Sequence, residues 1–204
     1  MVTASICCES SKKTRNGDAS AIMKFLNTPI QDVVLIEPQV FGDARGFFLE
    51  TWHKEKFAAA GIDATFVQDN QSRSSQWTLR GLHFQSEHTQ GKLVRVAAGS
   101  VFDVVVDLRR SSSSFGKWWG VDLSAKNHRM LWVPKGLAHG ILVTSENADF
   151  LYKCTDFYSP PHERTLAWND PALDIRWPLP PGTTPVMSAK DREGATFAAL
   201  EKFP

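Results

Sequence analysis

Short strand-like runs dominate this chain of 204 residues and restrict its fold more than any other feature. Val, Ile, Phe, Trp and Tyr gather in segments such as DVVLIEP, KLVRVAAG, SVFDVVVDLR and HGILVTS, and Gly, Pro, Ser and Asn separate these segments. Only residues 53–61 and 188–203 have a helical pattern. The sequence therefore predicts an all-β sandwich or small β-barrel with short peripheral helices, whose mouth could bind a small ligand.

The chain is expected to contain one folded domain preceded by a tail. Residues 1–24 are polar, rich in Ser and Lys, and without apolar periodicity, so we expect disorder there. Residues 25–204 contain no internal repeat or linker. With 42% hydrophobic residues in the chain, this part is long enough to bury a sizeable core. We expect it to be a single domain that ends in a C-terminal helix over residues 188–203.

Charge and cysteine content exclude several classes of protein. Lys plus Arg number 23 and Asp plus Glu number 22, so the net charge of +1 gives no reason to expect nucleic acid or a membrane surface as partner. No apolar run approaches the roughly 18 residues of a membrane span. The three cysteines are Cys7, Cys8 and Cys154. Their odd number and spacing predict neither disulfides nor a zinc site, and favour a reducing, cytoplasmic compartment.

The histidines do not form a metal-binding pattern. A His-x-His pair that began at His83 would need a histidine where Gln85 stands. His88 lies in a polar loop and His139 is isolated in LAHGILV. Because no ligand cluster accompanies them, we expect no metal.

His83 alone would most often be a structural histidine, but its neighbours favour a functional one. Arg80, Lys92, Arg95 and Asp103 all lie on strands expected to be adjacent in the barrel. Buried cations are costly unless they are paired or face a liganded cavity. Strict strand alternation puts Arg80 and His83 on opposite faces. If both line one cavity, Gly81 should mark a bulge.

Two further residues have both a structural and a chemical interpretation. Tyr152, in FLYKC, is either a packing residue or a phenol that donates a proton. Ser188 and Asp191, in SAKD, fit a capping box at the start of the last helix, and this explains Asp191 without any chemistry.

Many motifs in order resemble one known family, the dTDP-4-dehydrorhamnose 3,5-epimerases. They cover roughly residues 25–191 and include FGDARGFFLETW, FVQDNQSRS, LRGLHFQ, QGKLVRV, LWVPKGLAHG, FLYKCTDFYSPPHERTLAWNDPAL, IRWPL and SAKD. The resemblance implies a cupin-like jelly-roll β-barrel or sandwich, no metal or organic cofactor, and a homodimer. Residues 25–38 are the candidate for an N-terminal segment exchanged between its subunits. It further implies epimerisation of dTDP-4-dehydro-6-deoxy-D-glucose at C3 and C5, on the route to dTDP-L-rhamnose.

The same resemblance assigns roles to individual residues. His83 resembles the catalytic base, Asp191 its carboxylate partner, Tyr152 the general acid, and Lys92 the lysine near the sugar carbonyl. Positions that resemble substrate contacts are Arg45, Glu50, Gln68, Asn70, Arg80, His139, Glu163 and Lys190. Phe157 stands where a tyrosine is common and could stack on thymine together with Phe41 of the partner subunit. Gln71 stands where the family usually has histidine, and we assign it no catalytic role.

The sequence leaves other functions open. Some related proteins epimerise only C3, and the same base would serve that reaction. A non-catalytic sugar-nucleotide-binding barrel would keep the aromatic and arginine positions but would not need His83, Lys92 and Tyr152 together. A metal-dependent cupin oxygenase is a third alternative.

Overall fold

The structure is a computed structural model that describes residues 22–204. The tail predicted to be disordered, residues 1–24, lies outside the described residues apart from residues 22–24. The strands are β1 (Lys24–Asn27), β2 (Val34–Glu37), β3 (Val40–Asp43), β4 (Gly46–Leu49), β5 (Gln68–Ser75), β6 (Leu79–Gln85), β7 (Lys92–Ala98), β8 (Ser100–Asp107), β9 (Trp118–Ser124), β10 (Met130–Val133), β11 (Leu137–Val143), β12 (Asn147–Cys154) and β13 (Glu163–Thr165). The helices are α1 (Lys54–Ala59), α2 (Ala189–Arg192) and a 3-10 turn (Pro160–His162).

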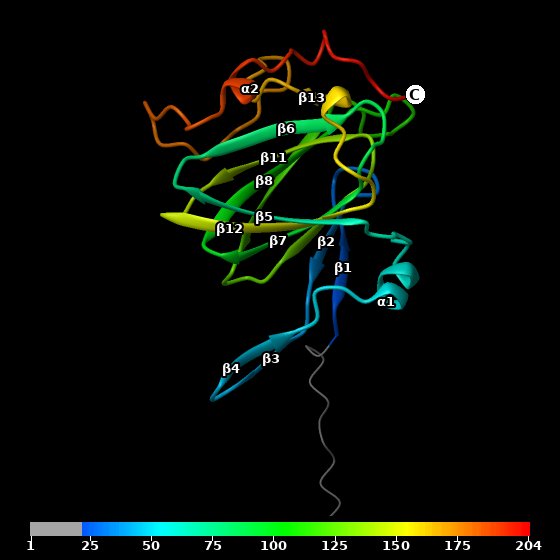
Figure 1. The fold of residues 1–204 in the computed structure, drawn as a ribbon, viewed down its shortest axis with the longest axis vertical. Coiled ribbons are helices and arrows are strands. Elements are labelled where there is room, and N and C mark those ends of the chain that lie inside the picture. The colour runs from blue at the N-terminus through cyan, green and yellow to red at the C-terminus, as the bar shows by residue number, and fades with distance from the viewer. Residues whose placement is uncertain (1–21) are drawn as a thin grey trace, which may run out of the picture.

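Two antiparallel sheets face each other and form the body of the molecule (Figure 1). One has six strands in the order β1-β2-β10-β7-β12-β5, and the other has five in the order β13-β6-β11-β8-β9. They are separate sheets and are not closed into a barrel. This arrangement confirms the predicted all-β, jelly-roll sandwich with short peripheral helices.

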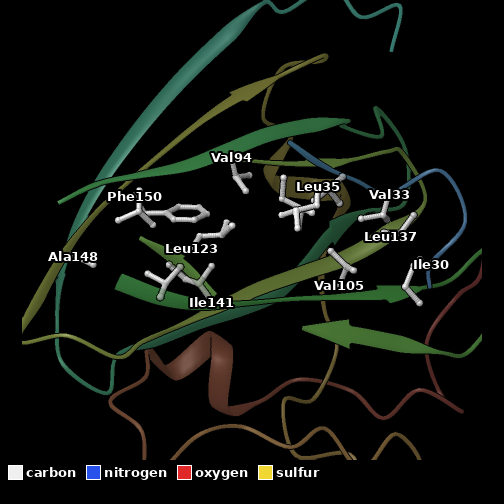
Figure 2. Packing of buried hydrophobic residues seen from close by; sticks show 14 of the residues in the cluster. Ile30, Val33, Leu35, Val94, Val105, Leu123, Leu137, Ile141, Ala148 and Phe150 are labelled. Atoms are coloured by element: carbon white, nitrogen blue, oxygen red, sulfur yellow. The ribbon is translucent and has the colours of Figure 1, made fainter. Parts of the chain in front are cut away.

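The main core lies between the two sheets. Val94 and Phe150 from the six-stranded sheet meet Val105, Leu123 and Ile141 from the five-stranded sheet, and all five are buried (Figure 2). These residues alternate along their strands with residues of the opposite face, as the period of 2 requires. Beside this packed interior, residues of both sheets also line a cavity.

Every residue of β11 is buried, because both faces of its sheet are covered. Ile141 belongs to the core between the sheets, whereas Ala138 packs into a second cluster on the outer face. That second cluster is covered by the C-terminal part of the chain, which runs over the five-stranded sheet (Figure 1). The continuous apolar run around β11 is thus explained by burial on both sides.

The predicted C-terminal helix over residues 188–203 is wrong beyond Arg192, where α2 ends. A Cβ at Gly194 would lie 2.8 Å from Ala167 N, so this glycine allows the two segments to approach closely. The backbone of Ala195 then bonds to Thr165 and Ala167 instead of closing helical turns. Apolar side chains spaced as in a helix pack on the sheet in an irregular segment, and these are Phe197, Leu200 and Phe203.

The helix predicted for residues 53–61 is confirmed as α1. Its buried residue, Phe57, contacts Phe25 edge-on at 5.1 Å and Trp52 at 4.4 Å between ring centroids. This aromatic cluster fixes the short helix beside β1 and β2. Within residues 22–204 there is no helix with the length and apolar character needed to cross a membrane.

The hairpin β3–β4 projects away from the two sheets (Figure 1). Its aromatic side chains Phe41, Phe47 and Phe48 are 52%, 63% and 68% exposed. Large apolar side chains at such exposure are unusual on the surface of an isolated subunit. The hairpin therefore has the composition of an interaction surface.

Candidate functional site

A cavity of about 620 Å³ opens between the two sheets. One wall is formed by β6 and β11 of the five-stranded sheet, and the other by β5, β7 and β12 of the six-stranded sheet. The short helix α2 and residues near β13 complete its rim. Ten of the residues predicted for the site line this cavity, and they are Gln68, Asn70, Arg80, His83, Lys92, His139, Tyr152, Glu163, Lys190 and Asp191.

The predicted bulge at Gly81 is present. The pairing of β6 with β11 changes register between His139 and Ile141, opposite this glycine. Gly81 has a φ of +123°, a conformation that residues with a Cβ rarely adopt. The irregularity brings Arg80 and His83 to the same cavity, although strict alternation would separate them.

His83 and Asp191 form a close pair on one wall. His83 Nε2 lies 2.5 Å from Asp191 Oδ1, and Asp191 is only 4% exposed. Ser188 Oγ donates to Asp191 Oδ2 at 2.7 Å, and the Gly81 N–H points to Asp191 Oδ1 at 3.4 Å. Burial alone would raise the pKa of Asp191, but the hydrogen bonds from His83, Ser188 and Gly81 outweigh it and lower this pKa to about 2. Asp191 is therefore ionised at neutral pH.

The capping interaction and the His–Asp pair coexist. Ser188 is the N-cap of α2, and its Oγ accepts a hydrogen bond from Asp191 N at 3.2 Å. Because the cap fixes the Asp191 backbone, it also directs the carboxylate towards His83. One arrangement thus contains both the predicted capping interaction and a contact between Asp191 and His83.

Tyr152 lies on β12, in the sheet opposite His83. Its ring is half-buried and packs against the edge of the core beside Phe150, at 5.9 Å between centroids. Burial raises the pKa of the Tyr152 phenol, and the nearby charge of Arg80 opposes this only in part. The hydroxyl group consequently keeps its proton at neutral pH.

Lys92 reaches the cavity from β7, also opposite His83. Burial lowers the pKa of its ammonium group, while the charges of Cys154, Glu163 and Asp103 act in the other direction. Among the described residues no carboxylate lies within 4.0 Å of the Lys92 ammonium group. A half-buried cation without a paired anion is suited to stabilise negative charge on a ligand.

A second histidine pair lies beside the first. His139 is directly opposite His83 in the pairing of β11 with β6. Its Nε2 contacts both oxygens of the fully buried Asp103, at 2.9 and 3.0 Å, and its ring stacks on Phe150. These contacts fix the ring at the wall of the cavity.

The rim carries a polar network that the sequence only partly predicted. Glu163 accepts hydrogen bonds from Lys190 at 2.8 Å and from Tyr158 Oη at 2.7 Å. The Tyr158 N–H in turn donates to Gln68 Oε1 at 2.9 Å. Tyr158 was missed because it follows Phe157 beyond the end of β12, where strand alternation no longer tells which aromatic residue faces the cavity.

Four predicted residues do not line the cavity of their own chain. Phe41, Arg45 and Glu50 lie on or beside the projecting hairpin β3–β4, where Arg45 pairs with Asp43. Phe157 is 64% exposed, and its backbone oxygen accepts a hydrogen bond from Gln85 Nε2.

Gln71, the position where the family usually has histidine, contacts a different space. It lines a second cavity of about 310 Å³ on the six-stranded sheet, together with Arg95 and Lys153. The residue is therefore separated by the sheet from His83 and Asp191.

The arrangement can move protons at a carbon next to a carbonyl group. A histidine with a carboxylate partner stands on one wall, and a phenol and an ammonium group stand on the facing wall. A ligand between the walls would meet a base on one face, an acid on the other, and a cation for a developing oxyanion. In residues 22–204 no group of three or more His, Cys, Asp or Glu side chains is placed to hold a metal ion.

Comparisons with known proteins identify close relatives over nearly all described residues. The family model described as dTDP-4-dehydrorhamnose 3,5-epimerase matches residues 27–199. An enzyme of that name from Pseudomonas aeruginosa is 55% identical over 183 residues, which is 89% of this chain and all of that protein. The enzyme of that name from Salmonella typhimurium is 53% identical, over 83% of this chain and 93% of that protein.

A solved structure agrees in fold as well as in sequence. The dTDP-6-deoxy-D-glucose-3,5-epimerase of Legionella pneumophila, in complex with dTDP-4-keto-L-rhamnose, superposes with a TM-score of 0.84 and is 49% identical. The match covers 88% of this chain and 95% of that one. The similarity thus includes both sheets that form the cavity.

Proposed function

The chain belongs to the dTDP-4-dehydrorhamnose 3,5-epimerase family and is an epimerase, and from that premise we propose how its cavity performs the reaction. The substrate is dTDP-4-dehydro-6-deoxy-D-glucose, and the reaction inverts C3 and C5. Both carbons are α to the ketone at C4. Removal of either proton leaves an enolate, and return of a proton to the opposite face inverts the centre.

His83 is the base in this proposal. Its Nε2 contacts Asp191, which is ionised, and the carboxylate orients the ring and stabilises the imidazolium that forms. The other ring nitrogen is then available to the substrate. General-base catalysis of this kind contributes about 10²–10⁴-fold to the rate.

Tyr152 and Lys92 act from the facing wall. Tyr152 donates a proton to the face of the sugar opposite His83, and its raised pKa keeps that proton available. Lys92 stabilises the charge that develops on the C4 oxygen, an interaction worth about 3–4 kcal/mol when a comparable donor is removed. The single observation that carries the proposal is this opposition of base and acid across one cavity from different sheets.

The remaining lining residues bind the sugar nucleotide. Arg80 and Lys190 provide positive charge for the diphosphate, and charge-assisted hydrogen bonds of this kind are strong. Gln68, Asn70, Glu163 and His139 supply polar contacts around them. Tyr158 lines the cavity and is suited to stack on thymine, and the exposed Phe157 beside it is a second aromatic side chain for this contact.

The functional unit is a homodimer in which the hairpin β3–β4 reaches the cavity of the partner subunit. Three exposed phenylalanines on the hairpin support this, because such a surface is normally covered. Arg45 and Glu50 would then contact substrate bound in the other subunit, and Phe41 would pack beside its thymine. If the segment 25–38 with β1 and β2 is exchanged, β2 makes with the partner's β10 the same pairing that it makes here within one chain.

Proton NMR of the dTDP-4-keto sugar in deuterium oxide tests the function. We expect deuterium to replace the protons at both C3 and C5 in the presence of the protein. Exchange at C3 alone would identify a C3 epimerase. No exchange at either carbon would contradict catalysis and leave only a binding protein.

A further inference from the structure

We propose that Gly140 is a positioning residue whose lack of a side chain lets the β6 bulge hold Arg80 and His83 in one cavity. The inference rests on the proposed roles of these two residues and adds a residue that touches neither the reacting carbons nor the diphosphate in that scheme. It concerns how the backbone of β6 is placed, and not which groups transfer protons.

The contact between Gly81 on β6 and Gly140 on β11 leaves no space for a side chain. A Cβ on Gly140 would lie 2.8 Å from Arg80 O, 3.0 Å from Leu82 Cδ2 and 3.2 Å from Gly81 Cα. A Cβ on Gly81 would lie 2.5 Å from Gly140 Cα. Since the first of these neighbours is backbone, a side chain at position 140 would push β6 away from β11.

Hydrogen bonds connect the bulge to the site on both sides of Gly81. On one side, the Gly81 N–H points to Asp191 Oδ1 at 3.4 Å, the same oxygen that contacts His83 Nε2. On the other side, Arg80 Nε donates to Ser74 Oγ at 2.9 Å, and Ser74 is buried on β5 of the facing sheet. A displacement of β6 would therefore disturb both the His83–Asp191 pair and the position of Arg80.

Gly140→Ala tests the proposal because Gly140 has no positive φ that alanine would strain. The matched control is Gly120→Ala on β9 of the same sheet, where a Cβ would lie 2.2 Å from the Phe102 ring and far from the site in the strand order. Three quantities are measured for each variant: the midpoint of thermal unfolding, kcat with KM, and the downfield proton resonance of the His83–Asp191 hydrogen bond in ¹⁵N-histidine-labelled protein.

For Gly140→Ala we expect kcat to fall by about 10–10²-fold and the downfield resonance to shift or vanish, because small misplacements of catalytic groups carry costs of this size. For Gly120→Ala we expect a lower unfolding midpoint with kcat and the resonance unchanged. If Gly140→Ala changes only the midpoint, as the control does, the proposal is wrong. The resonance is read without turnover, so this result is independent of whether the proposed reaction is correct.

Ser74→Ala examines the other side of the bulge and removes only one hydroxyl group, so the fold is retained even if Gly140→Ala does not fold. Because Arg80 loses its buried anchor, we expect KM for the sugar nucleotide to rise while kcat and the His83–Asp191 resonance stay unchanged. An unchanged KM would show that Arg80 is not held by this contact and would contradict the proposal.

Discussion

At the scale of single residues, burial and hydrogen bonding set the charge of each group in the cavity. Asp191 is ionised because its hydrogen bonds lower its pKa to about 2. Burial raises the pKa of Tyr152 above its ordinary value of 10.0, so its phenol stays neutral even in mildly alkaline solution. At neutral pH the site therefore has an ionised carboxylate beside His83 and a protonated phenol on the facing wall, which suits proton transfer at two faces of a ligand.

Tyr152→Phe separates proton removal from proton return. The change deletes one hydroxyl group and little volume, so folding should persist. We expect the base to continue exchanging protons with deuterium oxide, while net inversion at C5 falls by about 10²–10⁴-fold. Simultaneous measurement of solvent exchange and product formation by NMR checks this. Product formation at the wild-type rate would remove Tyr152 from the mechanism.

The lowered pKa of Lys92 predicts a loss of activity at alkaline pH. Burial lowers its pKa below the ordinary value of 10.5, so the ammonium group loses its proton at a lower pH than an exposed lysine would. The oxyanion then has no cation to stabilise it. Because the pKa of Tyr152 is raised, the phenol is not the first group to titrate. In Lys92→Arg the charge persists, and the descending limb of kcat/KM against pH should move to higher pH, where the Tyr152 phenol titrates. A limb at the same pH in this variant would exclude Lys92 as its source.

Whether a predicted side chain faces the cavity can be inferred from the sequence on the strands, but not in the irregular segment after β12. His83, Lys92 and Tyr152 lie on strands, and each lines the cavity as expected. Phe157 and Tyr158 follow β12 in an irregular segment, so their directions depend on contacts such as that of Gln85 with the Phe157 oxygen. Such contacts join residues far apart in the sequence and leave no local signal.

At the scale of elements, α2 shows that a very short helix can have a large effect. It contains only Ala189–Arg192, yet its N-cap Ser188 fixes the carboxylate that contacts β6. The sequence predicted this start correctly from the capping pattern. Its predicted end was wrong because Gly194 and Ala195 pack against residues 165–167, and tertiary contacts override helix propensity there.

The contact of Asp191 on α2 with His83 predicts how the stability of the folded protein depends on pH in the acid range. The pKa of Asp191 is lowered from 3.8 to about 2 in the folded protein. Its contribution to stability is therefore present above 3.8 and is lost as the pH falls towards 2, and it amounts to about 2 kcal/mol. Asp191→Asn should remove this part of the pH dependence. Urea unfolding of both proteins across this acid range measures it, and parallel curves would contradict the assignment.

At the scale of the whole molecule, the sandwich of two sheets could be predicted from the sequence. The strand pairing that forms the cavity could not. Alternating apolar residues and turn signals predict the strands, and burial on both faces explains the apolar run of β11. The pairing of β6 with β11 and its register shift involve residues more than 50 positions apart, such as His83 and His139. Strand propensity does not specify pairings of that kind.

Mixing two inactive variants tests whether subunits share their cavities. His83→Asn removes the base of a subunit's own cavity, and Arg45→Ala removes a side chain that we place in the partner's cavity. In a mixed dimer, one cavity carries both defects and the other carries neither. We expect activity to return when the purified variants are mixed and allowed to exchange subunits. Each variant incubated alone is the control, and no recovery in exchanged dimers would argue against a shared site.

The central claim is that His83 removes the substrate's protons, and deuterium exchange catalysed by His83→Asn tests it most directly. Asparagine keeps a polar side chain of similar reach, so circular dichroism and dTDP binding should match the wild type. We predict that exchange at C3 and at C5 falls together, by about 10²–10⁴-fold, since one base serves both carbons. Near-normal exchange at either carbon in the folded, dTDP-binding variant would contradict this account.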